Sequence, residues 1–297
     1  MTFYMDTCNK KRVLDVCNCP EDILQDVASN LEPYIRIRPK YLTRDIYGTI
    51  ICKEGNDNAV YKRDNVIEVI WSNSVQLRMT VRRVIRAFFY EALIIRDGWV
   101  PIHASAVINA QNDVTIFTGD KGAGKTSSVL ACVMKNKELK FISNDRIFIN
   151  KHSSYMIGCP TTVGIGNDTM SLLNIDKAGE RQNNKTWIFP NDLRDMGVKF
   201  AKGGKIKQII VPAFDFDSKE LKIFTDGIES DKILVENIRT DIQDDVWHWE
   251  NPIRNREDFG YWISKTNWCK QLICIKIICG GLSEEYYKVL KSYCVNE

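Results

Sequence analysis

The sequence predicts an α/β protein with a mixed sheet, and three observations lead to that fold class. A β-rich run at 114–117, a glycine-rich loop at 119–124 and a helical pattern at 127–134 follow one another closely. Further β-rich runs alternate with helical patterns along the rest of the chain. Before residue 98 the β-rich runs are short and a polar turn separates them, which predicts a small β-rich N-terminal region. We therefore expect an N-terminal region over 1–97 and a larger domain over 98–297.

Composition limits the classes of protein. The chain has 297 residues, of which 44% are hydrophobic and 27% charged, as in an ordinary globular protein. The net charge of +3 is too small to indicate nucleic-acid binding. No apolar run reaches the ~18 residues that span a bilayer, and the first residues lack the apolar core of a signal peptide. We expect a cytoplasmic protein that binds neither membrane nor nucleic acid.

The cysteines favour a buried, reduced role. The chain has ten cysteines and three histidines, and no cysteine pair has C-x-x-C spacing. Cys269, Cys274 and Cys279 lie in or beside an apolar run, which is typical of thiols in a core strand.

The N-terminal region begins with a predicted helix at 21–27, after Pro20. Runs at 34–38, 48–52 and 66–71 indicate antiparallel strands. A long helix is predicted over 75–97 and ends at Gly98. Its basic residues recur at helical spacing and form a patch that is either a solvated face or a docking surface for an acidic peptide or phosphorylated partner; they are Arg78, Arg82, Arg83 and Arg86.

In the larger domain we expect strands at 99–108, 140–143, 147–149, 185–189, 207–214 and 272–278. Loops are expected at 159–167 and, exposed and basic, at 200–205. Helices are expected at 170–173, at 233–246, at 261–264, and from Ser283 onward, where Ser283 is the cap.

The loop at 119–126 fits the pattern G-x-x-x-x-G-K-[ST], whose parts have separate physical roles. Its glycines permit backbone angles that aim successive N–H groups into one hollow, which suits phosphate oxygens at a helix N-terminus. Lys125 is predicted to contact the β- and γ-phosphates, and Thr126 to ligate Mg²⁺. The predicted nucleotide-binding residues are Gly119, Asp120, Lys121, Gly122, Ala123, Gly124, Lys125, Thr126 and Ser127.

A carboxylate follows the next apolar strand. Asp145 comes directly after 140–143 and Asn144, where a residue that holds Mg²⁺ or activates an acceptor is expected behind a P-loop helix. The alternative is an aspartate that only forms a turn. Lys185 is a further cation for the acceptor side, or else a solvated lysine.

Three segments together resemble a known family. The strand 103–107, which begins with His103, the loop 118–126 and Asn144-Asp145-Arg146 resemble HPr kinase/phosphorylase and its relatives of the phosphoenolpyruvate-carboxykinase-type fold. The layout is most similar to the HPr-kinase-like peptide kinases. The resemblance implies a kinase that uses ATP or GTP with Mg²⁺ and phosphorylates a Ser or Thr hydroxyl of a peptide or protein. It also implies a homo-oligomer, catalytic roles for Lys125 and Asp145, and an acid/base or orienting role for His103, which otherwise is a core histidine.

The chain departs from the family pattern in three ways. Asn144 stands where the relatives have the first aspartate of a pair, and Lys121 stands where they usually have serine. No clear equivalent of their arginine-bearing C-terminal motif is found, which argues against HPr as the substrate. Two other functions therefore stay open: a nucleotide-binding regulatory protein with little turnover, and a small-molecule kinase.

Overall fold

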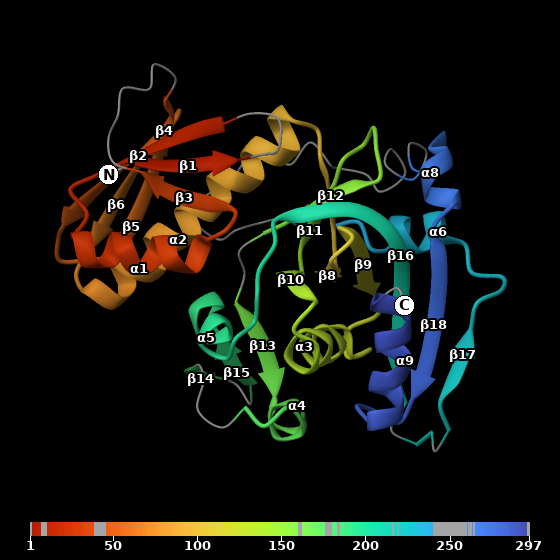
Figure 1. Ribbon diagram of the computed structural model, residues 1–297. Coiled ribbons are helices and arrows are strands. Elements are labelled where there is room, and N and C mark those ends of the chain that lie inside the picture. The colour runs from red at the N-terminus through yellow and green to blue at the C-terminus, as the bar shows by residue number, and fades with distance from the viewer. Residues whose placement is uncertain are drawn as a thin grey trace. The chain divides into compact units, whose positions relative to one another are not determined.

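The computed structural model (Figure 1) describes residues 2–6, 11–38, 46–159, 162–175, 180–182, 185–215, 217–218, 220–239, 260, 263 and 265–295. The described residues up to Gly98 form one compact unit, and those from Trp99 onward form another. Both units combine helices with β-sheet, so the molecule belongs to the mixed α/β class. No helix among the described residues is long and apolar enough to cross a membrane.

The first unit holds a sheet of strand order β3-β1-β2-β4-β6-β5 in the described part of the chain. Its strands are β1 Thr2–Asp6, β2 Lys11–Cys17, β3 Ile35–Arg38, β4 Ile46–Glu54, β5 Ala59–Arg63 and β6 Val66–Trp71. Its helices are α1 Glu21–Leu31, α2 Ser74–Glu91 and a π-helical turn, η1 Ala92–Arg96.

The expected all-antiparallel pairing of this unit is wrong. Strand β4 runs parallel to both β2 and β6. The connection from β2 to β4 contains α1 and β3, which is long enough to return the chain to the same end of the sheet. The segment β5 lies on the far side of β6, so it does not pair with β4. Strands β1 and β2 have no counterpart among the sequence predictions.

The helices of the first unit follow the sequence closely. Pro20 precedes α1, and Asn73 caps α2 by accepting a hydrogen bond from the Gln76 N–H at 2.9 Å. The predicted apolar face of α2 is buried. On the opposite side Arg78 is exposed and pairs with Asp26 at 3.5 Å, so at least this member of the basic patch lies on a solvated face.

The second unit is built on a sheet of strand order β10-β8-β9-β16-β12-β11-β7 in its described part, with β18 beside β16 and β17 beside β18. Its strands are β7 Val100–Ile102, β8 Ala104–Ile108, β9 Asp113–Thr118, β10 Lys140–Ser143, β11 Ile147–Ile149, β12 Tyr155–Gly158, β16 Gly203–Phe214, β17 Lys222–Phe224 and β18 Ile273–Cys279. A smaller sheet has the order β13-β15-β14, from Val163–Gly166, Lys185–Ile188 and Glu180–Gln182.

The helices of the second unit are α3 Lys125–Lys135, α4 Asn167–Leu172, α5 Pro190–Asp195, α6 Ser230–Glu236, α8 Asn267–Lys270 and α9 Glu284–Cys294. The Ser283 hydroxyl caps α9 by accepting from the Tyr286 N–H at 3.0 Å, which confirms the predicted start of that helix. The helix predicted over 233–246 is confirmed at 233–236 and wrong at 237–239, because α6 ends at Glu236 and Ile238 forms a β-bridge. Residues 240–246 and most of 261–264 lie outside the described residues.

Two glycine pairs lie in strands, although loops were predicted at their positions. Gly164 and Gly166 belong to strand β13, although residues 159–167 were expected to form a loop. Gly203 and Gly204 begin β16, inside the expected basic loop. A Cβ on Gly203 would lie 2.0 Å from the Met156 carbonyl oxygen, so this glycine serves the close approach of two strands.

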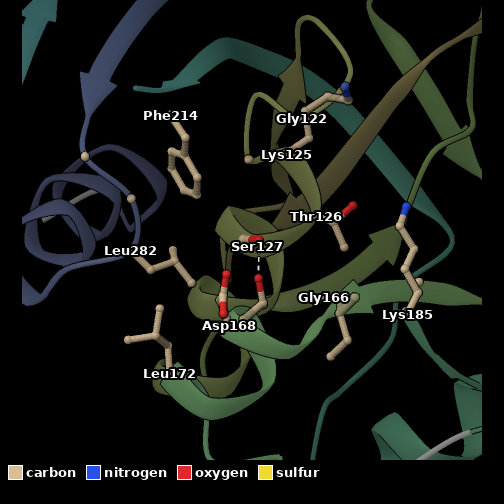
Figure 2. Close-up of a pocket in the computed structure, with 16 residues that line it drawn as sticks. Gly122, Lys125, Thr126, Ser127, Gly166, Asp168, Leu172, Lys185, Phe214 and Leu282 are labelled. Carbon is tan, nitrogen blue, oxygen red and sulfur yellow. Dashed lines mark hydrogen bonds between the residues drawn. The ribbon is translucent and has the colours of Figure 1, made fainter. Parts of the chain in front are cut away.

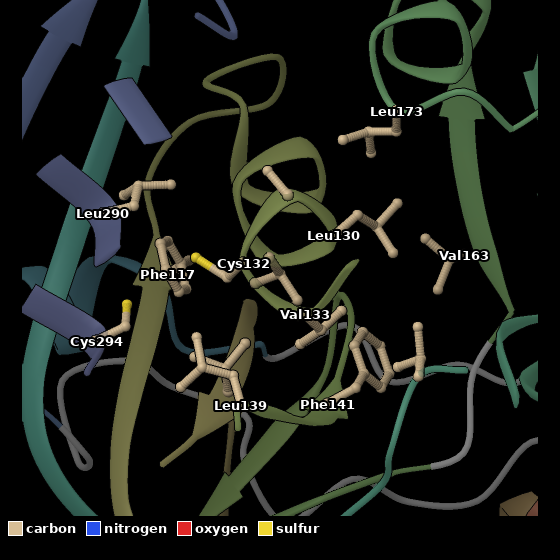
Figure 3. Close-up of a cluster of buried hydrophobic side chains, with 14 of the residues drawn as sticks. Phe117, Leu130, Cys132, Val133, Leu139, Phe141, Val163, Leu173, Leu290 and Cys294 are labelled. Atoms are coloured by element: carbon tan, nitrogen blue, oxygen red, sulfur yellow. The ribbon is translucent and has the colours of Figure 1, made fainter. Parts of the chain in front are cut away.

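Helix α3 is packed into the core of the second unit. Leu130, Cys132 and Val133 of this helix are buried, with Phe117 of β9 and Leu290 of α9 in the same cluster (Figure 3). A side-chain hydrogen bond with Cys294, together with burial, raises the pKa of the Cys132 thiol well above its usual range. The described cysteines are free thiols, and Cys269, Cys274 and Cys279 are buried, as expected. The core thus fixes the helix that follows the glycine-rich loop.

Candidate functional site

The glycine-rich loop joins the end of β9 to the start of α3, as predicted. Gly119, Gly122 and Gly124 have positive φ angles of 135°, 88° and 96°, which only glycine adopts readily. Gly124 carries a second constraint, because a Cβ there would lie 2.7 Å from the ring of Phe214. The loop therefore needs glycine at these positions, both for its backbone angles and for its contact with β16.

The Lys125 ammonium bends back over this loop. Its Nζ donates to the carbonyl oxygens of Gly119 and Asp120, each at 2.8 Å. Lys125 is only 8% exposed, and its burial lowers the pKa of the ammonium, although the charges of Asp145 and Asp120 oppose this shift. An anion above the loop would meet a desolvated cation that is already held in place.

The Thr126 hydroxyl is tied to the segment after β10. It donates to Asn144 Oδ1 at 2.8 Å, and the same oxygen accepts from the Ser105 hydroxyl at 2.9 Å. Asn144 and Ser105 are both buried. Ser105 also accepts a long hydrogen bond, of 3.4 Å, from the Asp145 N–H. This network connects β8, α3 and the turn that carries Asp145, and its member Ser105 was not predicted.

Asp145 lies at the centre of a charged cluster. Its Oδ1 accepts from His103 Nε2 at 2.8 Å and from Arg239 Nη2 at 3.0 Å. Partial burial raises the pKa of Asp145, but the His103 hydrogen bond and the Arg239 charge outweigh it and bring the pKa to about 2. The carboxylate is ionised at neutral pH. Its backbone has φ of 67°, a left-handed conformation that is uncommon for aspartate outside turns and functional sites.

Backbone pairing places His103 and Arg239 together. The expected single strand over 99–108 is interrupted at His103, between β7 and β8, because the His103 N–H donates to the Asn237 carbonyl at 2.8 Å. Arg239 N–H donates to the Pro101 carbonyl at 3.0 Å. These bonds flank the bridge between Ile102 and Ile238. Sequence analysis missed Arg239, because it treated that segment as helix.

A cavity of about 490 Å³ opens beside the loop (Figure 2). Lys125, Thr126 and Ser127 line it on one side, and Phe214 and Leu282 line its apolar part. Its other wall includes strand β13 and helix α4, where the Thr169 hydroxyl lies 2.8 Å from that of Ser127. The cavity has the polar loop and the apolar surface that a nucleotide requires.

The predicted site residues fall on two sides of the loop. Lys185 lines the cavity with Thr126 (Figure 2), whereas the described lining does not include His103 or Asp145. The charged cluster around Asp145 connects to the cavity through Asn144 and Thr126. A phosphate chain on the loop would therefore have the cavity at one end and the charged cluster at the other.

The oxygen atoms beside the loop fit Mg²⁺ rather than a metal held by the protein alone. Thr126 supplies a hydroxyl and Asn144 an amide oxygen, which are hydrogen-bonded to each other, and the adjacent Asp145 supplies a carboxylate. Among the described residues no group of three or more His, Cys, Asp or Glu side chains is arranged to hold a metal. Magnesium usually takes one or two protein oxygens and completes its shell with water and phosphate.

Fold and site together define a mixed α/β protein with a glycine-rich, phosphate-loop-like turn between a strand and a helix. No protein-family model and no curated protein matches this chain.

Proposed function

We propose that the protein is a Mg²⁺-dependent kinase that transfers the γ-phosphoryl group of a nucleoside triphosphate to a Ser or Thr hydroxyl of a peptide or protein. The observation that carries this proposal is the hydrogen-bonded path from Thr126 through Asn144 to the turn of Asp145. This path connects the glycine-rich loop to the turn of the ionised Asp145, which supports the proposal because phosphoryl transfer depends on positioning.

The loop and Lys125 would bind the phosphate chain. The N–H groups at the start of α3 would face the phosphates, with the positive end of the helix dipole behind them. Lys125 would exchange its two carbonyl contacts for phosphate oxygens. When bound, Mg²⁺ would neutralise charge on the β- and γ-phosphates, with Thr126 as its nearest protein ligand.

Asp145 would orient the acceptor. In the transfer, the bond between the γ-phosphorus and the bridging oxygen breaks, and a bond to the acceptor oxygen forms. The acceptor hydroxyl donates a hydrogen bond to Asp145, which takes the proton once the new bond has formed. Because His103 and Arg239 hold its pKa at about 2, Asp145 is a weak base. A loose transition state needs orientation of the hydroxyl more than its early deprotonation.

Transfer of labelled phosphate tests the proposal. Purified protein, Mg²⁺ and γ-labelled ATP or GTP are incubated with Ser- and Thr-containing peptides. Lys125→Met and Asp145→Asn should each reduce transfer at least about 100-fold, since each removes a charge from the reacting region. Lys137→Met, on an exposed lysine just beyond α3, is the matched control and should leave the rate unchanged. Transfer that survives both site variants would refute the assigned roles.

A nucleotide-binding regulator is the second candidate, and Asn144 is the observation that favours it. This neutral side chain contacts Thr126 where phosphotransferases commonly have an aspartate. Tight retention of nucleotide without transfer to peptides or small-molecule hydroxyls would support the regulator. Transfer to a small hydroxyl compound alone would instead indicate a small-molecule kinase.

A further inference from the structure

A second cavity, of about 240 Å³, adjoins the one beside the loop. Leu172, at the end of α4, and Leu282, just before α9, line both cavities. Figure 2 places these two leucines next to each other, at the end of the first cavity away from the loop. The two cavities therefore meet at an apolar pair that could hold a flat ring.

One face of α3 runs along both cavities. Ser127 lines the first cavity, and Ala131 and Lys135 line the second. These residues are four apart, so they share a helical face, and Lys135 lies about 12 Å along the axis from Ser127. The small side chain of Ala131 leaves space between them. This path, from Ser127 past Ala131 to Lys135, leads from the phosphate end to a charged pair.

The charged pair consists of Lys135 and Glu284, whose Nζ and Oε2 are 2.7 Å apart. The Lys135 Nζ also lies 4.9 Å from the centre of the Tyr287 ring, which holds the ammonium from a second side. The Lys135 hydrogen bond lowers the pKa of Glu284, so its carboxylate is ionised. The end of the path thus offers a strong donor beside a strong acceptor.

We infer that this path binds the nucleoside of the nucleotide, with the base between Leu172 and Leu282, and that Lys135 and Glu284 select guanine over adenine. The inference rests on the proposed binding of a nucleotide at the loop. Guanine presents the O6 acceptor next to the N1–H and N2–H donors, which matches an ammonium beside a carboxylate. Adenine presents a donor where guanine has O6 and an acceptor at N1, so both groups would face the wrong partner.

Calorimetric binding separates this inference from the proposed function. The probes are the β,γ-imido analogues of GTP, ITP and ATP, and inorganic triphosphate, each with Mg²⁺. The GTP analogue should bind about tenfold more tightly than the ATP analogue. This ratio is at the low end for discrimination between bases, because the Lys135 and Glu284 side chains are exposed to solvent. The ITP analogue, which lacks the N2 amino group, should lie between them, and triphosphate should bind more weakly than all three.

Variants test the selecting residues. Glu284→Gln should remove the preference for guanine, whereas Glu285→Gln, on the next residue of the same helix, should keep it. Lys135→Met should weaken the GTP analogue, and Lys137→Met should not. Equal binding of the GTP and ATP analogues, or a preference that survives Glu284→Gln, would overturn guanine selection while leaving the kinase proposal standing. If the three nucleotide analogues bind no more tightly than inorganic triphosphate, the inferred nucleoside path is overturned. Failure of every probe to bind would overturn both proposals.

Discussion

Replacement of Asn144 by leucine should destabilise the second unit, because it removes one oxygen that serves two hydroxyl groups. Leucine has nearly the same shape, so the change leaves no large cavity. The Thr126 hydroxyl lines the cavity and can bond to water instead, so its lost hydrogen bond costs about 1 kcal/mol. Ser105 is 1% exposed, and its hydroxyl would keep a proton without an acceptor, which costs about 1–3 kcal/mol. The expected loss of unfolding free energy is about 2–4 kcal/mol.

A double-mutant cycle identifies the Ser105 share of this cost. Ser105→Ala combined with Asn144→Leu should recover about 1–3 kcal/mol relative to Asn144→Leu alone, since no buried hydroxyl is then left without an acceptor. Because the chain has two compact units, the unfolding free energy should be measured for the second unit, which contains Asn144 and Ser105. Hydrogen exchange of β8 and β10 peptides under increasing urea reports on the second unit. A loss below about 1 kcal/mol, or strictly additive single and double variants, would refute the claim that Asn144 Oδ1 holds both hydroxyls.

Three further predictions concern charge and buried hydroxyls. Asn144→Asp keeps an oxygen that accepts the Thr126 hydrogen bond and adds a negative charge beside it. Mn²⁺ titrated in the presence of nucleotide should therefore bind about tenfold more tightly. An unchanged affinity for Mn²⁺ would contradict the proposed metal site at Thr126. Ser128→Ala should cost about 1–3 kcal/mol of unfolding free energy in urea, because it leaves the buried Tyr286 hydroxyl without its partner at 2.7 Å. Tyr286→Phe should cost only about 1 kcal/mol, because Ser128 keeps its hydrogen bond to the Gly124 carbonyl. A larger cost for Tyr286→Phe than for Ser128→Ala would contradict this prediction. Arg239→Met should raise the pKa of Asp145 from about 2 toward its ordinary value, since it removes a positive charge 3.0 Å from the carboxylate. A carboxyl NMR titration that shows no rise would show that Arg239 does not act on Asp145.

The parts of the site that were predicted are those that local sequence encodes. The strand, the glycines and the helix from Asp113 to Lys135 are contiguous, and each follows from its own residues. The resemblance implied separate roles for His103 and Asp145 and no contact between them, whereas His103 Nε2 lies 2.8 Å from Asp145 Oδ1. Arg239 is 94 positions from Asp145, and its approach depends on backbone pairing with Pro101. No local pattern reports such a contact.

The strand errors have the same origin. In a sequence taken alone, glycine indicates a turn. Gly203 is instead needed because β16 approaches the Met156 backbone closely, and a Cβ added to Gly164 would lie 3.0 Å from the Trp187 ring. Whether β4 runs parallel or antiparallel to its neighbours depends on which strand it pairs with. That choice is made by tertiary packing, so the β-rich runs predicted the strands and not their directions.

The charge balance around the loop gives Asn144 a physical rationale. Lys125, Arg239 and Lys185 bring positive charges to the loop and Asp145 and Asp120 bring negative ones, so these side chains together leave one net positive charge. An aspartate in place of Asn144 would cancel it. A triphosphate would then depend more strongly on Mg²⁺ for its attraction to the loop. With asparagine, the site would attract a nucleotide by its own cations. The neutral Asn144 oxygen keeps the Thr126 hydroxyl oriented, and Asp145 would remain the carboxylate for the proposed acceptor. Weaker metal dependence of nucleotide binding is therefore the expected consequence of Asn144, and it does not require loss of phosphoryl transfer.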